Sequence, residues 1–295
     1  MKYVQFIAAI AIIIVTSTSE LLSINEETPR HEMTLKPVVY EISGMENIIV
    51  QRDVVFEQSE NSNLAMDIYL PNASLTKELK PAVIFVYGYS DSSFEKILGC
   101  KFKEMQCYIT WARLVAASGI VAITYSNQNP QNDLQSLLEY IKKNAVDLGI
   151  DADRMAIWAS SGNVPLALFA LTQKPHSFKC GVLYYGFMLD LDQSTFVADA
   201  AKQFLFVNPS MGKSITDLPP TLPLFLARAG LDQTPHLNDS FDLFVNAALS
   251  HNLPITVENY STGVHAFDLL DASDKSRNII RKTLDFLKFH LDFNS

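Results

Sequence analysis

The sequence predicts an α/β protein with a mostly parallel central sheet, helices on both faces of that sheet, and an antiparallel strand pair at its amino-terminal side. Short apolar runs alternate with amphipathic, helix-forming segments over roughly 210 residues, which is the pattern of a parallel sheet covered on both faces. Ahead of this alternation, two runs rich in β-branched residues flank the turn-prone residues 60–63, as in an antiparallel pair.

The composition favours one well-packed domain. Of the 295 residues, 48% are hydrophobic and 19% are charged, so the chain can bury a substantial core. The formal net charge is −9 and no run of Lys or Arg exceeds two residues, which excludes the electrostatic footprint of a nucleic-acid-binding protein. The sequence has neither an internal repeat nor a Gly/Ser-rich linker, so we expect a single domain over residues 48–295.

The amino-terminal residues predict export. Residues 1–19 combine Lys2, an apolar run from Val4 to Val15 and a small polar stretch, which is the pattern of a secretory signal peptide cleaved after Ser17 or Ser19. The apolar run is short for a spanning helix, which needs about 20 residues; a retained membrane anchor is the alternative. Loss of Lys2 takes the formal net charge from −9 to −10. We expect a secreted or periplasmic protein with no stable membrane partner after cleavage.

The remaining elements follow in order along the chain. Residues 20–47 are polar and are expected to form an irregular, poorly ordered lead-in, and residues 187–220 a small cap. Apolar, β-branched runs predict the strands at 48–56, 64–70, 82–87, 120–125, 155–158, 181–185, 222–229 and 255–260. Apolar residues at helical spacing predict the helices at 107–117, 162–172, 237–250, 273–291, and from a cap at Asn132 or Asp133 to Gly149.

A serine follows the strand predicted at 155–158. In open α/β sheets, ligands bind beyond the carboxyl ends of the strands, and a serine on a tight strand-to-helix turn matches the nucleophile elbow G-x-S-x-G of serine hydrolases. Here the turn has Ala159 and Asn163 in place of the two glycines. Ser161 stands at the nucleophile position, and Ser160 is the competing candidate. The alternative is that either serine only caps the next helix.

A base and an acid follow later strands. A serine hydroxyl needs a base to take its proton, and His265 lies just past the strand that ends near 260; His236 is a minor candidate. Asp232 follows the strand at 222–229, with Asp239 as its nearest rival. Ser161, Asp232 and His265 then occur in the chain order Ser, Asp, His of the α/β-hydrolase triad. The alternative for His265 and for Asp232 is an ordinary loop residue with no catalytic role.

The predicted oxyanion hole takes one donor from each of two loops. The amide of Gly162, directly after the nucleophile, is the first donor. The second comes from the loop after the strand at 82–87. Gly88 permits a sharp turn in this loop, and we predict the amide of Tyr89 as the donor. Tyr89 and the phenylalanines of this loop and of 187–220 are candidates for an apolar acyl pocket, although about half of them are expected in the core: Phe94, Phe187, Phe196 and Phe204.

These motifs resemble the α/β-hydrolase superfamily, in its small esterase branch similar to dienelactone hydrolases and acetyl-esterase/lipase-like proteins. The resemblance covers residues 50–292 and depends on 82–90, 151–163, 230–232 and 263–265. Family members commonly have His-Gly where this chain has Tyr87-Gly88. The resemblance implies the α/β-hydrolase fold and a serine esterase that cleaves carboxylic esters of small molecules through an acyl-enzyme, without metal or organic cofactor. A peptidase-like enzyme and a non-catalytic binding protein of the same fold are the alternatives.

The sequence contains three cysteines and three glycosylation sequons. It does not determine whether the cysteines pair or whether the sequons are glycosylated. Cys100 and Cys107 are close enough in sequence to pair, whereas Cys180 begins an apolar run and is expected as a buried thiol. The sequons are at Asn72, Asn238 and Asn259. The oligomeric state and the acyl and alcohol groups of the substrate are also open.

Overall fold

The computed structural model describes residues 29–58, 63–71, 78–175 and 177–292. One sheet of eight strands runs through it in the order β1-β2-β4-β3-β5-β6-β7-β8. β2 is antiparallel to both β1 and β4, and every pairing from β4 to β8 is parallel. The predicted fold class is therefore confirmed. The strands are β1 (Ile49–Gln58), β2 (Asn63–Leu70), β3 (Lys80–Phe85), β4 (Val121–Tyr125), β5 (Ile150–Ser160), β6 (Cys180–Tyr184), β7 (Leu224–Ala229) and β8 (Ile255–Tyr260).

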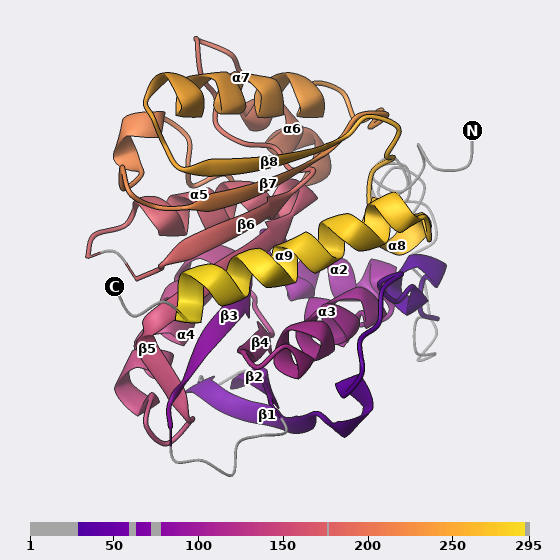
Figure 1. Cartoon of the computed structure of the whole chain (residues 1–295), viewed down its shortest axis with the longest axis vertical. Helices are drawn as coiled ribbons and strands as arrows, with labels where there is room; N and C mark the ends of the chain where they lie inside the picture. Colours follow the sequence, from indigo (N-terminus) through magenta and orange to yellow (C-terminus); the bar gives the residue numbers. More distant parts are fainter. Residues whose placement is uncertain (1–28, 59–62, 72–77, 176, 293–295) are drawn as a thin grey trace, which may run out of the picture.

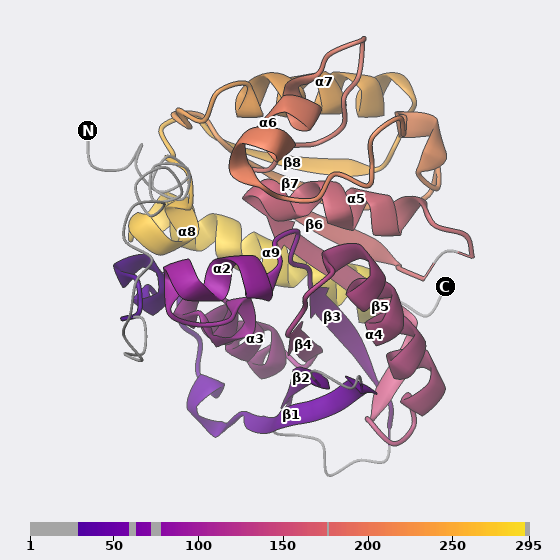
Figure 2. The ribbon, with the colours of Figure 1, turned by 180° about the vertical axis from the view of Figure 1, so that it is seen from behind.

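Helices cover both faces of the sheet. The long helix α9 crosses in front of the sheet in Figure 1, whereas α4 and α5 lie in front of it in the reverse view of Figure 2. Because both faces are covered, β3, β4 and β6 consist almost entirely of buried residues. The helices are α2 (Asp91–Leu98), α3 (Gln106–Ala117), α4 (Pro130–Asn144), α5 (Val164–Thr172), α6 (Phe196–Phe204), α7 (Leu237–Ser250), α8 (Phe267–Leu270) and α9 (Asp274–Asp292).

One helix boundary and one additional short helix differ from the sequence-based expectation for local reasons. α4 begins at Pro130 and is capped by Asn129, whose side chain accepts from the amide of Asn132, so the predicted caps at Asn132 and Asp133 were wrong. Proline is favoured at the first helical position because its missing N–H has no partner there. The short helix α2 was not predicted, since its eight residues give too little periodicity.

The described part of the lead-in is packed against the domain. Residues 29–47 form two short 3-10 turns, η2 (Glu32–Leu35) and η3 (Met45–Asn47). The amide of His31 donates to Leu98 O at 3.0 Å, and the amide of Val39 donates to Asp268 O at 2.8 Å. Met33 is 8% exposed. The expectation of a poorly ordered segment was therefore wrong for residues 29–47. The segment is polar on average, but a few apolar side chains in it are buried against the domain.

The predicted signal peptide lies outside the described residues, and so does the sequon at Asn72. Among the described residues, no helix is long and apolar enough to cross a membrane. All three cysteines are free and buried, so the pairing left open for Cys100 and Cys107 does not form here.

Candidate active site

The turn after β5 holds Ser161 in a strained backbone conformation. β5 ends in extended geometry at Ser160, with φ −134°, and Ser161 then has a φ of +56°. This left-handed region is unfavourable for residues with a side chain and occurs at nucleophile elbows, where it pushes the hydroxyl out above the sheet. Of the two candidate serines, Ser161 has this geometry.

The loop after β3 packs directly on the elbow. A Cβ on Gly88 would lie 2.6 Å from the carbonyl oxygen of Gly162, so only glycine permits this approach. The amide of Gly88 donates to Asn163 Oδ1 at 2.7 Å, and Asn163 Nδ2 donates to the Tyr108 hydroxyl at 3.0 Å. Asn163, which stands where the family motif has glycine, thus fastens this loop to the elbow.

This fastening changes the part that Gly88 plays. Its amide is already used by Asn163. Gly88, which the sequence predicted as part of the oxyanion hole, is therefore a close-packing residue and not a donor to a substrate oxygen. Tyr89 is the next residue, and within the described residues its amide takes part in no hydrogen bond. The amides of Tyr89 and Gly162 are left as the candidate donor pair.

His265 and Asp232 meet beyond the ends of β8 and β7. His265 Nδ1 lies 2.6 Å from Asp232 Oδ2, and the Asp232 side chain is fully buried whereas that of His265 is 13% exposed. Burial opposes ionisation of Asp232, but the charge and hydrogen bond of His265 outweigh it and hold the pKa of Asp232 below its ordinary value. With Nδ1 bound to the carboxylate, Nε2 is left for the reacting group.

Ser161 and His265 line one cavity. Its volume is about 80 Å³, and its wall is mostly apolar. Among the described residues no hydrogen bond joins the Ser161 hydroxyl to His265, and such contacts often tighten only when substrate binds. The cavity is lined by Met33, Tyr89, Leu98, Phe102, Met105, Cys107, Tyr108, Trp111, Trp158, Ser160, Ser161, Asn163, Tyr185, His265, Ala266, Asp268 and Leu269.

The cavity wall differs from the predicted acyl pocket. Of the aromatic residues proposed for it, only Tyr89 lines the cavity. Phe94, Phe187 and Phe204 are buried in the core, and Phe196 stacks on His236 with ring centroids 4.5 Å apart. The wall comes instead from α2, α3, α8 and the turn that carries Met33. The 187–220 segment touches the site elsewhere, where the amide of Val207 donates to Gly88 O at 2.8 Å.

The rival acid and base lie outside this cavity. His236 is 59% exposed and pairs with Asp239 at 2.9 Å, three residues away on the same helix start. Neither residue lines the cavity. The structure therefore brings together Ser161, Asp232 and His265 and leaves His236 and Asp239 at the surface.

A second buried carboxylate supports the histidine through an aromatic ring. Asp268 accepts hydrogen bonds from the Tyr185 hydroxyl at 2.5 Å and from Trp111 Nε1 at 2.8 Å. The Tyr185 ring lies 4.8 Å from the His265 ring, centroid to centroid. Burial raises the pKa of Asp268. Sequence analysis missed Asp268, although it stands only three residues after the candidate base.

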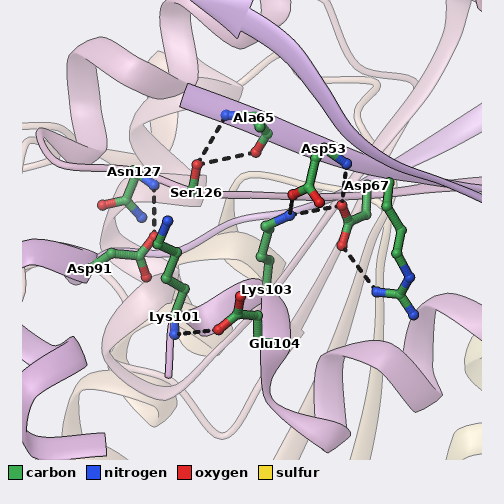
Figure 3. Close-up of polar contacts among 10 residues, drawn as sticks. Asp53, Ala65, Asp67, Asp91, Lys101, Lys103, Glu104, Ser126 and Asn127 are labelled. Carbon is green, nitrogen blue, oxygen red and sulfur yellow. Dashed lines mark hydrogen bonds and ion pairs between the residues drawn. The ribbon is translucent and has the colours of Figure 1, made fainter. Parts of the chain in front are cut away.

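Ion pairs and hydrogen bonds of charged residues fix the loop that contains Phe102, a residue of the cavity wall. The Nζ atom of Lys103 contacts Asp53 Oδ1 at 2.6 Å and Asp67 Oδ1 at 2.8 Å (Figure 3). Lys103 and Asp67 are 5% and 2% exposed, and a buried ion pair is retained only where its geometry is good. Asp91 accepts from the amides of Phe102 at 2.8 Å and Asn127 at 2.9 Å. These contacts fix the loop between α2 and α3 against β2 and β4.

No group of three or more His, Cys, Asp or Glu side chains is placed to hold a metal ion in the ranges the structure describes. Neither the family models nor the curated protein sequences contain a match to this chain.

Solved structures do resemble it. A thermophilic esterase from the planctomycete Thermogutta terrifontis is 15% identical, with a TM-score of 0.62 over 85% of this chain and 98% of that one. A bacterial heroin esterase is 16% identical, with a TM-score of 0.59 over 83% and 84%. An α/β-hydrolase enzyme from the metagenome of Lake Arreo in Spain is 17% identical, with a TM-score of 0.61 over 83% of each chain. Together with the strand order and the site at the carboxyl ends of the strands, these likenesses identify the fold of the chain as that of the α/β-hydrolases.

Proposed function

We propose that this protein is a serine hydrolase that cleaves small carboxylic esters. The observation that carries the proposal is the 2.6 Å contact between His265 and the buried Asp232, on the same cavity as Ser161 in its strained turn. An imidazole oriented by a buried carboxylate and facing a serine is the arrangement that activates a hydroxyl for attack.

The reaction proceeds in two halves. His265 takes the Ser161 proton as the hydroxyl oxygen attacks the ester carbonyl, and the amides of Gly162 and Tyr89 hold the tetrahedral oxyanion. His265 then gives its proton to the leaving alcohol. Water, activated by the same histidine, hydrolyses the acyl-enzyme and releases the acid.

The cavity favours short acyl groups. Its volume of about 80 Å³ has room for roughly five to eight water-sized groups. The Thermogutta terrifontis esterase was solved with propionate bound, and it is also described phosphoramylated by tabun. We expect turnover of p-nitrophenyl acetate, propionate and butyrate, and at least tenfold slower turnover of the octanoate.

A fluorophosphonate probe tests the nucleophile. We expect labelling that maps to Ser161, is lost in Ser161→Ala and is retained in Ser160→Ala, which serves as the matched control. A folded wild-type protein that takes up no label and hydrolyses no short ester would contradict the proposal and favour a binding protein. Cleavage of peptide bonds faster than esters would favour the peptidase alternative.

Export is part of the same proposal. It is supported by the signal-like residues 1–19, and finding the protein retained with its first residues intact in fractionated cells would contradict it.

A further inference from the structure

A buried carboxylate outside the candidate triad lines the same cavity as the candidate base. Asp268 lies on the short helix α8, three residues after His265, and is 1% exposed. Its side chain accepts from the Tyr185 hydroxyl at 2.5 Å and from Trp111 Nε1 at 2.8 Å, so its partners are two neutral donors. Taking a carboxylate out of water without a cationic partner is costly. Carboxylates in such surroundings are common at functional sites.

Tyr185 connects this carboxylate to the imidazole. It follows β6 in the left-handed region, with a φ of +30°, and its amide donates to Ala227 O at 2.7 Å. Its ring lies 4.8 Å from the His265 ring, centroid to centroid, while its hydroxyl contacts Asp268. One aromatic ring therefore separates the carboxylate from the imidazole, and the packing of that ring fixes their separation.

Charge couples the two groups as well. Burial raises the pKa of Asp268, while its two hydrogen bonds and the charge of His265 oppose the rise. Coulomb attraction is mutual, so the ionised carboxylate in return favours the imidazolium form of His265. Salt screens the interaction of such buried groups only weakly.

The other titratable groups around this pair leave the effect to Asp268. Asp232 contacts Nδ1 of His265 at 2.6 Å and is the acid of the candidate triad. Three further groups act on Asp268 or are acted on by it, and burial raises the pKa of each, so they are neutral near pH 7. These groups are Tyr184, Tyr185 and Cys107.

We propose that Asp268 is a positioning residue that stabilises the charged form of His265 during the reaction. When Ser161 Oγ forms its bond to the ester carbonyl carbon, its proton moves to Nε2 of His265 and the ring becomes positive. Asp232 and Asp268 then stabilise this charge together. Asp268 exchanges no proton with the substrate. The inference rests on the proposed esterase function and adds a second carboxylate to the support of the base.

Asp268→Asn tests the charge. The variant can keep both contacts, because its carbonyl oxygen can accept from Trp111 and its amide group can donate to the Tyr185 oxygen. The value of kcat/KM rises with pH as His265 loses its proton, and without the negative charge this proton leaves more easily. We expect the midpoint of that rise to move to lower pH by about 0.5–1 unit. Since one unit is a tenfold change in equilibrium, kcat for p-nitrophenyl acetate at high pH should fall by about three- to tenfold.

Two variants separate charge from structure. Asp268→Glu keeps the charge on a longer side chain, so it should lose stability in urea yet keep the midpoint within about 0.3 unit of wild type. Asp133→Asn is the matched control, because Asp133 is a buried carboxyl whose pKa burial raises and which accepts from two backbone amides at 2.6 and 2.7 Å. It does not line the cavity, and we expect it to keep both the midpoint and kcat.

NMR makes the test independent of turnover. In protein labelled with ¹³C-histidine, the ring signal of His265, assigned by its loss in His265→Gln, should titrate with the same displaced midpoint in Asp268→Asn. If Asp268→Asn does not fold, Asp268→Ser is a second uncharged variant, whose hydroxyl can still accept from Trp111, and the same displacement is expected.

An unmoved midpoint in the uncharged variant overturns the role of Asp268, and so does a fall in kcat without that movement, since a structural role alone would produce it. Either result leaves the esterase proposal standing, provided wild type turns over esters and is labelled at Ser161. A wild type that neither turns over nor takes up label overturns both.

Discussion

Asn163 connects the elbow to the loop after β3, and its removal tests whether that connection matters for catalysis. Asn163 is 3% exposed and bonds the amide of Gly88 and the hydroxyl of Tyr108. In Asn163→Ala both bonds are lost, and the amide of Gly88 loses its acceptor. We expect the variant to be less stable and slower than wild type.

The expected loss of stability follows from the two bonds. An unpaired buried donor costs about 1–3 kcal/mol, and the lost bond to the Tyr108 hydroxyl about 1 kcal/mol more, so the free energy of unfolding should fall by roughly 2–4 kcal/mol. The catalytic loss has a separate cause. Tyr89 follows Gly88 directly, and a displacement of about 1 Å in a positioning element can cost about 10²-fold in rate. We expect kcat to fall 10- to 100-fold.

Urea unfolding followed by tryptophan fluorescence measures the first quantity, and p-nitrophenyl acetate turnover measures the second. Asn163→Asp is the control, because its carboxylate still accepts from the Gly88 amide. It can also accept from the Tyr108 hydroxyl, which reverses the direction of the bond that Asn163 Nδ2 donates in the wild type. We expect it to lose stability through its buried charge yet to keep most of the kcat that Asn163→Ala loses. Equal kcat values in the two variants, or an unchanged kcat in Asn163→Ala, would refute the positioning role.

Three further predictions concern the proposed triad acid, a buried carboxyl and the thiols. Asp232→Asn should lower kcat by about 10³- to 10⁴-fold, because an amide facing Nδ1 of His265 favours the wrong tautomer; steady-state kinetics on a variant with unchanged near-UV circular dichroism checks this, and a loss below tenfold contradicts it. Burial raises the pKa of Asp91 from 3.8 to about 6, so the folded state binds this proton more tightly than the unfolded state. The protonated carboxyl of Asp91 stabilises the folded state fully below about pH 4, and this stabilisation is lost as the pH rises through 6. The free energy of unfolding therefore falls by roughly 2 kcal/mol between pH 4 and 8. Asp91→Asn does not titrate at this position, so its unfolding free energy minus that of the wild type should be larger at pH 8 than at pH 4 by that amount. Urea unfolding at both pH values measures this difference, and an equal difference at the two pH values would rule the effect out. Ellman's reagent should find no reactive thiol in the folded, unreduced protein and three after unfolding; a single thiol after unfolding would reveal a bond between Cys100 and Cys107.

Much of the fold could be predicted because the sheet is buried on both faces. Continuous apolar runs such as 120–125 and 222–229 correspond to β4 and β7, each within two residues of its observed bounds. Local rules worked less well for short elements. α2 and α8 contain eight and four residues, which is too few for a helical period to emerge, so α2 was missed although its Leu98 lines the cavity.

The candidate triad could be located because chain order and strand ends are features of the sequence. Ser161, Asp232 and His265 each follow an apolar run, and parallel strands bring such positions to one edge. The cavity wall could not be located in the same way. Met33 lies more than 200 residues from His265, in a polar segment with no periodicity, and only tertiary packing places it on the same cavity.

The sequence by itself therefore determined the fold class, the order of the elements and the candidate nucleophile, acid and base, because these depend on hydrophobic period and on residues next to strand ends. Tertiary structure decided which groups remain available to a substrate. Asn163 looked like a departure from the family motif, and in three dimensions it takes the amide of Gly88 and fastens the loop to the elbow. The hydroxyl of Tyr89 lies against Gly162. Hydrogen bonds between residues 75 positions apart depend on packing at ångström precision, which no local pattern in the chain encodes.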